Sequence, residues 1–269
     1  MHNVTLRLIV NCGPTEEFIA RCLESVRAQS FERWEAYVTM DPCGDQTLAA
    51  ALAATQGDPR IHLHQNKTRL YSMVNLIDAV RRSEAHVEDV FVTLDGDDWF
   101  ATPEALGIIH KTYMATDCWM TYGSWISDLP SGEGRWPAYP EGLIDFRGHK
   151  WLGTAVRTWK RWLWDLIDDR DFRDATGAYF RVTEDQALML PMLEMSGTGR
   201  ARHIPEVLMV YNRSSPHACV YTCREEMFDN ADYIRSRPPY VRLKEKPKFE
   251  RDGFKAEKNG YKHAGSFGQ

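Results

Sequence analysis

Residues 90–100, VFVTLDGDDWF, place an acidic turn directly after a short apolar run. The apolar run, residues 90–94, is typical of a strand buried on both faces, as in a parallel sheet. Three carboxylates at its carboxyl end are costly to bury unless a positive charge lies beside them. In open α/β sheets this end is also where ligands bind. A divalent cation together with a phosphate-bearing substrate would explain both features.

The turn itself is Asp95-Gly96-Asp97-Asp98. Gly96 permits a tight turn, in which alternate carboxylates point to the same side. Carboxylate oxygens suit hard cations such as Mg²⁺ or Mn²⁺, which usually keep water and substrate phosphate as further ligands. The alternative is an acidic turn that only caps the next helix. No P-loop and no dinucleotide-binding glycine motif follows a strand, so a bound nucleotide would be held through its base, its ribose and metal-bridged phosphates.

The first 115 residues alternate between strand and helix patterns. The chain has 269 residues, 43% hydrophobic and 26% charged, which is enough apolar material for one large α/β domain or two small ones. We expect strands at residues 5–10, 34–40, 61–64 and 90–94, and helices at residues 18–26, 48–54, 69–80 and 103–113, the first capped by Thr15. This alternation predicts a Rossmann-like, mostly parallel sheet flanked by helices.

Beyond residue 115 the pattern is less regular. We expect strands at residues 119–125 and 204–211 and helices at residues 157–167, 187–195 and 225–234. Thr183 and Gln186 match a capping box. The tryptophans between residues 119 and 164 form a core cluster or, alternatively, a platform on which an acceptor stacks. The loop at residues 128–142, with Trp136 and Tyr139, is the candidate acceptor wall or lid.

Three polar residues come first after apolar strands in the parallel half: Asn11, Asp41 and Asp95. If these strands are neighbours, the side chains converge at one edge of the sheet. Such a convergence predicts a ligand site at that edge. For Asp41 the alternative is a turn or helix-cap role, which is common for an Asp after a strand.

The order of these motifs resembles the family 2 glycosyltransferases with the GT-A fold, over about residues 4–217. Residues 6–47, LRLIVNCGPTEEFIARCLESVRAQSFERWEAYVTMDPCGDQT, are similar to three consecutive features of that family. These are its opening strand, its helix ending in Ser-Val-x-x-Gln and its Asp-x-x-x-Asp-x-Thr turn. Its helix carrying an Arg and an Asn near the donor is similar to NKTRLYSMVNLIDAV. Its DxD motif resembles LDGDDWF, and its Glu-Asp helix, which supplies the base, resembles TEDQALMLPMLEM.

The resemblance implies a role for each matching residue. Asp41 would bind the nucleotide base, Arg69 would help to hold base or phosphate, and Asp95 would contact the ribose. Asp97 would ligate the metal, and Asp185 would be the general base. The complete predicted nucleotide-sugar site consists of Asn11, Asp41, Arg69, Asp95, Gly96 and Asp97.

Two features depart from the family pattern. The second strand usually ends in an Asp-Asp-Gly-Ser type of turn, whereas this chain has Met40-Asp41-Pro42-Cys43 and keeps one Asp. The base contact at Asp41 therefore has less support than the other roles. The QxxRW motif of processive members does not follow Asp185, which predicts a non-processive enzyme rather than a polymerase.

Two residues of the second half are candidates for the chemistry. Asp185 lies in the first turn of a predicted helix, where the dipole and free N–H groups favour the ionised carboxylate that can take a hydroxyl proton. The alternative is that Glu184 and Asp185 are merely favourable first-turn acids. His217 follows the late strand, where a His completes the metal site in many relatives, and imidazole is an acceptable ligand. The alternative for a lone His is a surface or capping role.

These expectations combine into a metal-dependent inverting glycosyltransferase. Mn²⁺ or Mg²⁺ at Asp97 would bridge the diphosphate of a nucleoside diphosphate sugar, with a UDP-sugar as the expected donor. Asp185 would deprotonate an acceptor hydroxyl opposite the leaving diphosphate, so that in-line attack inverts the anomeric carbon. A glycan is the expected acceptor, and a hydroxylated DNA base is the alternative. The alternatives from other classes are a non-catalytic nucleotide-sugar-binding module and a nucleotidyltransferase.

Charge is unevenly spread along the chain. Residues 235–269 hold ten Lys or Arg against four Asp or Glu, so the net charge of −5 leaves about −11 on residues 1–234. A basic segment can bind nucleic acid or anionic lipid headgroups, and it can equally be a solvated extension. The expected division is a glycosyltransferase domain at 1–236, with a nucleotide-sugar half at 1–115 and an acceptor half at 116–236, followed by a loosely held basic tail at 237–269.

Location is predicted from what the sequence lacks. No apolar run is long enough to span a bilayer, and the first residues do not have the pattern of a signal peptide. Six cysteines without CxxC or metal-knuckle spacing are typical of reduced thiols. We therefore expect a cytoplasmic protein, either free or attached to the surface of a membrane.

Overall fold

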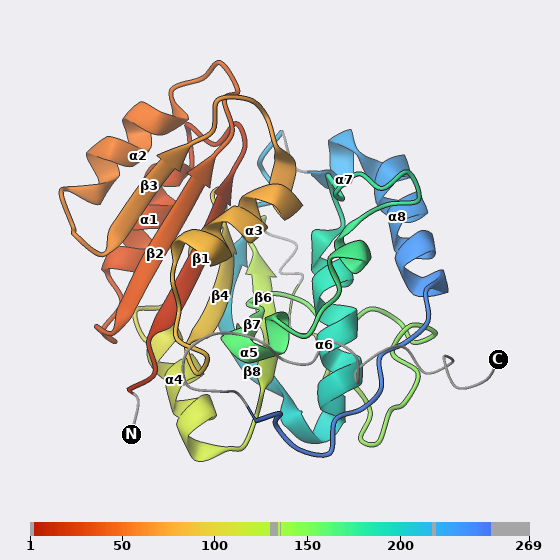
Figure 1. Ribbon diagram of the computed structural model, residues 1–269. Coiled ribbons are helices and arrows are strands. Elements are labelled where there is room, and N and C mark those ends of the chain that lie inside the picture. The colour runs from red at the N-terminus through yellow and green to blue at the C-terminus, as the bar shows by residue number, and fades with distance from the viewer. Residues whose placement is uncertain (1–2, 130–133, 135, 217–218, 249–269) are drawn as a thin grey trace.

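The computed structural model describes residues 3–129, 134, 136–216 and 219–248. Through these residues runs an eight-stranded sheet in the order β3-β2-β1-β4-β7-β6-β8-β5 (Figure 1). The strands are β1 (Leu6–Cys12), β2 (Trp34–Met40), β3 (Ile61–Gln65), β4 (Val90–Asp95), β5 (Trp99–Phe100), β6 (Met120–Ser127), β7 (Thr158–Lys160) and β8 (Ala201–Tyr211). The helices are α1 (Ile19–Arg27), α2 (Thr47–Thr55), α3 (Tyr71–Arg82), α4 (Ala105–Ala115), α5 (Arg161–Trp164), α6 (Glu184–Arg200), α7 (Cys219–Thr222) and α8 (Arg224–Ser236), with a 3₁₀ turn, η1 (Asp169–Phe172).

The first half forms the parallel section of the sheet, as predicted. β1 pairs in parallel with β2 and β4, and β2 pairs in parallel with β3. Val90, Phe91 and Val92 of β4 are fully buried, as expected for a strand covered on both faces. The register sets Asn11 opposite Asp95, so two of the predicted polar strand ends are direct neighbours.

The second half is mixed. β7 pairs antiparallel with β4 and β6, whereas β6 pairs in parallel with β8. The helix predicted at residues 157–167 is wrong, because residues 158–160 form β7 and only Arg161–Trp164 is helical. The Thr158 hydroxyl is buried between the hydroxyls of Tyr113 (2.8 Å) and Thr121 (2.6 Å). Tertiary pairing of this β-branched residue therefore outweighs the helical spacing of its neighbours.

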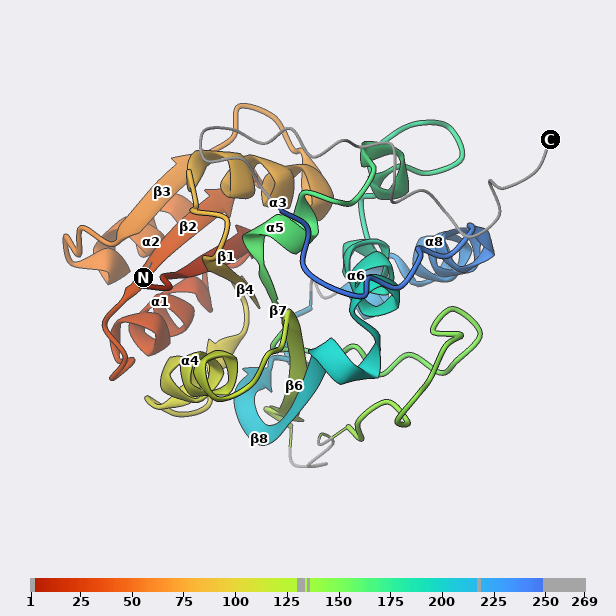
Figure 2. The ribbon, with the colours of Figure 1, turned by 60° about the horizontal axis from the view of Figure 1, so that its bottom comes forward.

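Helices cover both faces of the sheet and enclose two hydrophobic cores (Figure 2). One core lies under α1, α2 and α4 and includes Leu23 and Ile109. The other lies under α3, α5 and α6 and includes Trp119, Trp159 and Trp162, for which the core interpretation is confirmed. No helix in the described ranges is long and apolar enough to cross a membrane.

Two helix starts differ from the prediction. α1 begins at Ile19, and Thr15 does not cap it; instead the N–H of Thr15 donates to the Thr47 hydroxyl (3.0 Å). α6 begins at Glu184, and its N-cap Thr183 makes no capping bond, because its hydroxyl donates to the carbonyl of Met227 (3.3 Å). Thr183 has a φ of 68°, whereas a capping box needs an extended N-cap residue. The predicted capping box is therefore wrong.

Residues 237–248 pack against the domain, although the sequence predicts a loosely held tail. Tyr240 and Leu243 are buried, and the N–H of Leu243 donates to the carbonyl of Met195 (2.9 Å). Arg237 forms an ion pair with Asp171 (2.7 Å). The expectation of loose attachment is thus wrong for residues 237–248, because two apolar side chains anchor this basic segment. The rest of the predicted tail lies outside the described residues.

Candidate active site

The carboxyl ends of β1, β2 and β4 meet at one edge of the sheet, as predicted. The N–H of Gly96 donates to the carbonyl of Asn11 (2.8 Å), and the N–H of Asp41 donates to the carbonyl of Cys12 (2.9 Å). The Asn11 amide donates to the carbonyl of Ser72 at the start of α3 (3.3 Å). Its amide oxygen is buried and finds no hydrogen-bond partner among the described residues. This oxygen is available to a donor group of a ligand.

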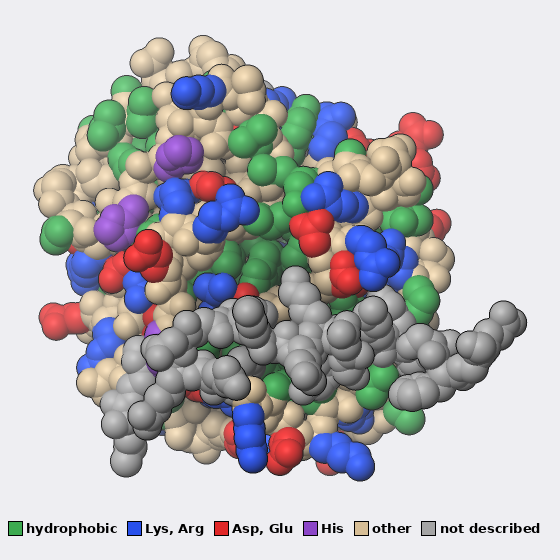
Figure 3. Space-filling model, viewed as in Figure 1, with side chains coloured by type: hydrophobic (Ala, Val, Ile, Leu, Met, Phe, Trp, Pro, Cys, Tyr) green, Lys and Arg blue, Asp and Glu red, His purple; other side chains and the backbone are tan. Residues whose placement is uncertain are grey.

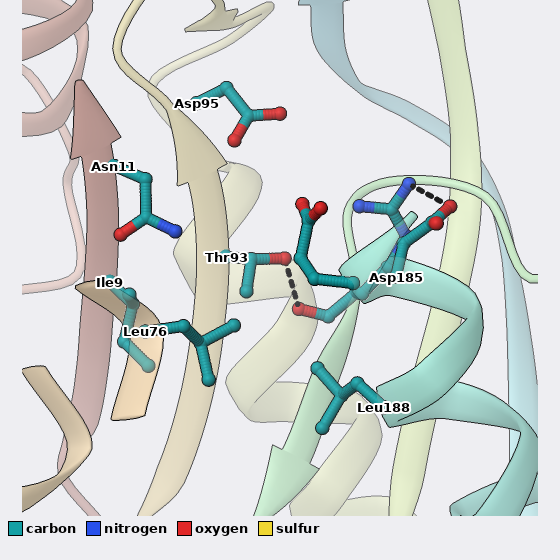
Figure 4. A pocket seen from close by; sticks show the side chains of 9 residues that line it. Ile9, Asn11, Leu76, Thr93, Asp95, Asp185 and Leu188 are labelled. Atoms are coloured by element: carbon teal, nitrogen blue, oxygen red, sulfur yellow. Dashed lines mark hydrogen bonds and ion pairs between the residues drawn. The ribbon is translucent and has the colours of Figure 1, made fainter. Parts of the chain in front are cut away.

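A pocket at this edge joins the sheet to α6 (Figure 4). It has a volume of about 300 Å³, its open mouth included, and is lined by Ile9, Asn11, Leu76, Thr93, Asp95, Arg157, Glu184, Asp185 and Leu188. Asp95, from the end of β4, and Asp185, from the first turn of α6, therefore face the same space. Of the other predicted site residues, Asn11 lines the pocket, whereas Asp41, Arg69, Gly96 and Asp97 lie outside its lining.

The carboxylates of the acidic turn raise one another's pKa. Burial, followed by the charges of Glu184 and Asp97, raises the pKa of Asp95 to about 7, while Arg157 opposes the rise. Burial and the charges of Asp95 and Asp97 raise the pKa of Asp98 well above its ordinary value. The ionised forms are thus disfavoured here, and a cation would stabilise them.

Glu184 belongs to the same group of acids. Burial and the neighbouring charge of Asp185 raise the pKa of Glu184, and the hydrogen bond from the Ser72 hydroxyl (2.8 Å) opposes the rise. Ser72 is the second residue of α3, so this bond ties the start of α6 to the start of α3. Both helices contribute to the pocket lining, α3 through Leu76 and α6 through Glu184.

Gly96 is needed because of close packing. A Cβ at this position would lie 2.5 Å from the Sγ of Cys12 and 3.2 Å from the carbonyl oxygen of Asn11. The φ of Gly96 is outside the positive range that favours glycine. The backbone of the acidic turn therefore lies directly against β1, which is a different reason for glycine from the tight turn of the prediction.

Asp41 acts as a cap for α3. Its carboxylate accepts hydrogen bonds from the N–H groups of Leu70 (3.0 Å) and Tyr71 (2.9 Å) and from the amide of Asn66 (2.8 Å). The side chain is 4% exposed. This is the capping alternative, applied to a helix about 30 residues further along the chain. Contact of Asp41 with a nucleotide base stays a prediction.

Arg69 lies at the surface beside the start of α3. Its guanidinium is 4.7 Å from the ring centroid of Tyr71, and the guanidinium of Arg181 is 4.2 Å from the same centroid. Tyr71 has a φ of 64°, an uncommon backbone conformation for a bulky residue. Two cations from separate segments thus lie against one aromatic ring at the start of α3, and the contact of Arg69 with a donor stays a prediction.

Asp185 is fixed by two hydrogen bonds. Its Oδ2 accepts from the guanidinium of Arg157 (3.1 Å), and its Oδ1 accepts from the N–H of Gln186 (2.8 Å). The side chain is 23% exposed, and Asp185 belongs to the pocket lining. A carboxylate held in this way can still accept a proton from a hydroxyl that enters the pocket. The predicted base is therefore in a suitable place, and its role stays a prediction.

The loop after β8 is attached to the acidic turn by Asp98. The N–H of Asn212 donates to the Oδ1 of Asp98 (2.8 Å), and both residues are almost fully buried. His217, the predicted metal ligand in this loop, lies outside the described residues. Within the described ranges no group of three or more His, Cys, Asp or Glu side chains is placed to hold a metal. The metal role of Asp97 accordingly stays a prediction.

Aromatic rings lie at the carboxyl ends of β6 and β8. The ring centroid of Trp125 is 6.1 Å from that of Trp136 and 5.1 Å from that of Tyr211, and all three side chains are half-buried. Tyr139, predicted to form an acceptor wall with Trp136, is instead buried in the core, where its N–H donates to the Tyr122 hydroxyl (2.9 Å). The acceptor-wall prediction is therefore wrong for Tyr139, and Trp136 remains accessible.

Three residues of the site were not given a role by the sequence. Asp98 and Glu184 stand next to predicted residues, so their position in the acidic turn and in the Glu-Asp pair was a usable signal. Arg157 has no such signal, because it follows an irregular loop and reaches Asp185 only through the fold.

The fold and the pocket define an α/β protein whose ligand site lies at the carboxyl edge of parallel strands. The sequence profile of glycosyl transferase family 2 matches residues 8–179. Because this match covers more than half of the chain, the chain belongs to glycosyl transferase family 2. No curated protein shows significant similarity to the chain.

Solved structures of glycosyltransferases share the fold. S. aureus TarS (residues 1–349) in complex with UDP superposes with a TM-score of 0.60 at 16% identity, covering 86% of this chain and 64% of that chain. The mannosyltransferase PcManGT from Pyrobaculum calidifontis, in complex with GDP-Man and Mn²⁺, gives a TM-score of 0.57 at 15% identity, covering 87% and 63%. A mycobacterial protein gives 0.60 at 14% identity, covering 97% and 83%. This chain therefore spans under two thirds of the TarS and PcManGT chains.

Proposed function

We propose that this chain is a metal-dependent inverting glycosyltransferase that moves a sugar from a nucleoside diphosphate sugar, with a UDP-sugar as the favoured donor, to a hydroxyl of a glycan. The observation that carries the proposal is the shared pocket, which Asp95 and Asp185 line from two sides. Membership of glycosyl transferase family 2 supports the reaction class. The UDP complex of TarS supports the choice of donor.

The residues divide between binding and chemistry. Asn11 and Asp95 would hold the nucleoside part of the donor, and Arg69 would help to hold its base or phosphates. Asp185 accepts the proton of the acceptor hydroxyl as the oxygen attacks the anomeric carbon. Attack from the side opposite the leaving diphosphate would invert the configuration of the anomeric carbon.

The acidic turn fits a hard cation. Its donor set is all carboxylate, and its members raise one another's pKa, so a positive charge would relieve their repulsion. Asp97 would hold the ion, with the diphosphate and water as further ligands. When bound, the ion neutralises charge on the leaving diphosphate. The Mn²⁺ complex of PcManGT supports this assignment.

A glycan acceptor is favoured by the half-buried rings of Trp125, Trp136 and Tyr211, because sugar rings pack on aromatic faces. The DNA alternative rests on the basic tail, and some of that charge is used within the protein. Arg237 pairs with Asp171, and Lys246 pairs with Glu88. The face shown in Figure 3 carries Lys and Arg interspersed with Asp and Glu around a hydrophobic area, which suits a neutral acceptor better than a polyanion.

Donor binding and product stereochemistry test the proposal. The protein is first screened by thermal shift against UDP-, GDP-, CMP- and dTDP-sugars, with and without Mn²⁺. A donor at a hundred times its Kd should stabilise the fold by about 2.7 kcal/mol, and only with the ion. NMR of the transfer product should then show an inverted anomeric configuration. Failure of every donor to bind in the presence of Mn²⁺ or Mg²⁺, or a retained configuration, contradicts the proposal.

A further inference from the structure

Among the described residues that line the pocket, only Arg157 carries a positive charge. Its guanidinium donates through Nη2 to the Oδ2 of Asp185 (3.1 Å), and the two side chains are 18% and 23% exposed. Figure 4 shows this ion pair on the α6 side of the pocket. None of the motifs in the sequence includes Arg157, and the family resemblance gives it no role.

Arg157 is itself held in place from two directions. Its Nε donates to the carbonyl of Gly153 (3.1 Å), which fixes the plane of the guanidinium. Its own carbonyl accepts from the N–H of Thr93 (3.0 Å) and from the Thr93 hydroxyl (3.4 Å). Thr93 belongs to β4, two residues before Asp95. Arg157 therefore connects β4 to α6. The carboxyl end of β4 belongs to the sheet edge that is proposed to bind the donor (the donor edge), and the first turn of α6 carries the proposed base, Asp185.

We propose that Arg157 is a positioning residue for the general base, which holds the Asp185 carboxylate at a fixed place in the pocket relative to Asp95. This inference rests on the proposed function, since it concerns the base of that reaction. With Oδ2 bound to Arg157 and Oδ1 bound to the N–H of Gln186, rotation of the carboxylate is restrained, and its remaining lone pairs can accept a proton from a hydroxyl in the pocket that Asp185 lines.

The surroundings need such a cation. Glu184 precedes Asp185, and burial together with the Asp185 charge raises the pKa of Glu184, while Arg157 opposes this rise. Without the guanidinium, two adjacent carboxylates would stand at the pocket wall with no facing positive charge from the pocket lining. Repulsion between them would turn Asp185 away from the productive direction.

The experiment is a double-mutant cycle between Arg157→Gln and Asp185→Asn, read by kcat, donor KM and the Kd for UDP with Mn²⁺. We expect Arg157→Gln to lower kcat at least about tenfold, because a misplaced base loses its alignment. Donor KM and the Kd for UDP should stay within about twofold, since the donor is held by other residues. In the Asp185→Asn background the second substitution should change kcat by less than about twofold, because the base that it positions is already absent.

Two further variants separate positioning from folding. Arg157→Lys keeps the charge and loses the Gly153 bond, so it should recover some of the lost kcat. Arg161→Gln removes an arginine of α5 from a comparable ion pair with Asp165, the residue that follows this helix, and should leave kcat unchanged. If the losses of kcat from Arg157→Gln and Asp185→Asn add in the double variant, the inference is wrong. It is also wrong if Arg157→Gln weakens UDP binding as much as it lowers kcat. Neither result contradicts the proposed function. Full activity of Asp185→Asn by itself overturns the base assignment of the proposed function, and the inference with it.

Discussion

The two halves of the molecule are held together by different means. Residues up to α4 form a parallel sheet whose strands are fixed by continuous apolar runs, and whose pairing extends over five to seven residues for each neighbouring pair. Beyond α4, β6 and β8 pair over eight residues with two register shifts, but β7 contributes only three residues to the sheet, and single polar contacts fix several of the segments between the strands. Arg147, Arg157 and Asp128 make such contacts. The donor edge therefore lies in the first half, where a periodic apolar pattern fixes the strands. The proposed base, Asp185, lies in the second half, where individual tertiary contacts matter more.

This difference separates two kinds of side chain in one pocket. Asp95 is placed by the register of β4 against β1, which the sequence determines through its apolar pattern. Asp185 is placed by Arg157 and by the start of α6. Changes in the first half should therefore act on binding and stability, and changes in the second half on the alignment of the reaction.

The largest expected effect comes from comparing Asp97→Ala with Asp185→Asn. Asp185→Asn should lower kcat by a factor of about 10² to 10⁴, because the proposed general base is lost, and leave the Kd for UDP with Mn²⁺ unchanged. Asp97→Ala should lower kcat and also raise the Kd for UDP with Mn²⁺, because Asp97 belongs to the donor edge. Isothermal titration and a transfer assay measure the two quantities. If both variants lose UDP binding to the same extent, the division between the halves is wrong.

The next effect concerns the buried ion pair that holds the second half. Arg147 donates to both oxygens of Glu194 (2.5 and 3.0 Å), and Glu194 also accepts from the N–H of Tyr240 (2.9 Å). Arg147→Met leaves the Glu194 carboxylate buried without its cation and should lower the free energy of unfolding by about 3 kcal/mol. Urea denaturation measures this, with Arg161→Gln as the control that should change it little. A loss below about 1 kcal/mol would show that the second half does not depend on this pair.

The same difference explains how much the sequence could predict. The strand predicted at residues 34–40 has the bounds of β2, and the meeting of Asn11 with Asp95 followed from the α/β pattern alone. The helix predicted around Thr158 was wrong because a buried hydroxyl contact, rather than periodicity, decides that segment. Arg157 could not be found, since its partner lies 28 residues away with no repeating pattern between them. Local periodicity thus predicts the first half and the donor edge. The rest depends on tertiary contacts, which the sequence pattern does not reveal.

Gly96→Ala tests the packing of the acidic turn in the first half. The new Cβ would lie 2.5 Å from the Sγ of Cys12, and overpacking of this kind costs about 1 to 3 kcal/mol of stability. Introducing Gly96→Ala into a Cys12→Ala background should cost clearly less, because the clashing sulfur is gone. Thermal unfolding of the four proteins measures the difference. Equal costs in both backgrounds would place the reason for glycine elsewhere.

Asp41→Asn separates capping from nucleotide contact. An Asn side chain keeps one acceptor oxygen and presents an NH₂ group where the carboxylate received the N–H of Tyr71. We expect a loss of about 1 kcal/mol of stability from the weakened cap of α3, measured by urea denaturation. The Kd for UDP should change by less than about threefold. A weaker Kd at unchanged stability would instead support contact with the base.

The smallest effect concerns Asp128, which fastens the loop after β8 to the end of β6. Partial burial alone would raise the pKa of Asp128, but hydrogen bonds from the Ser214 hydroxyl and from the N–H of Arg213 outweigh it and lower the pKa below the ordinary 3.8. Because the folded-state pKa is lowered, the stabilisation is present above about pH 4 and is lost as the pH falls through the folded-state pKa. Asp128→Asn should therefore cost about 0.5 kcal/mol at pH 7 and progressively less as the pH falls below 4, since water screens this partly buried carboxylate. Urea denaturation across this pH range measures the loss of free energy of unfolding. If this loss does not become smaller in acid, the shape of the Asp128 side chain, and not its charge, holds this loop of the second half.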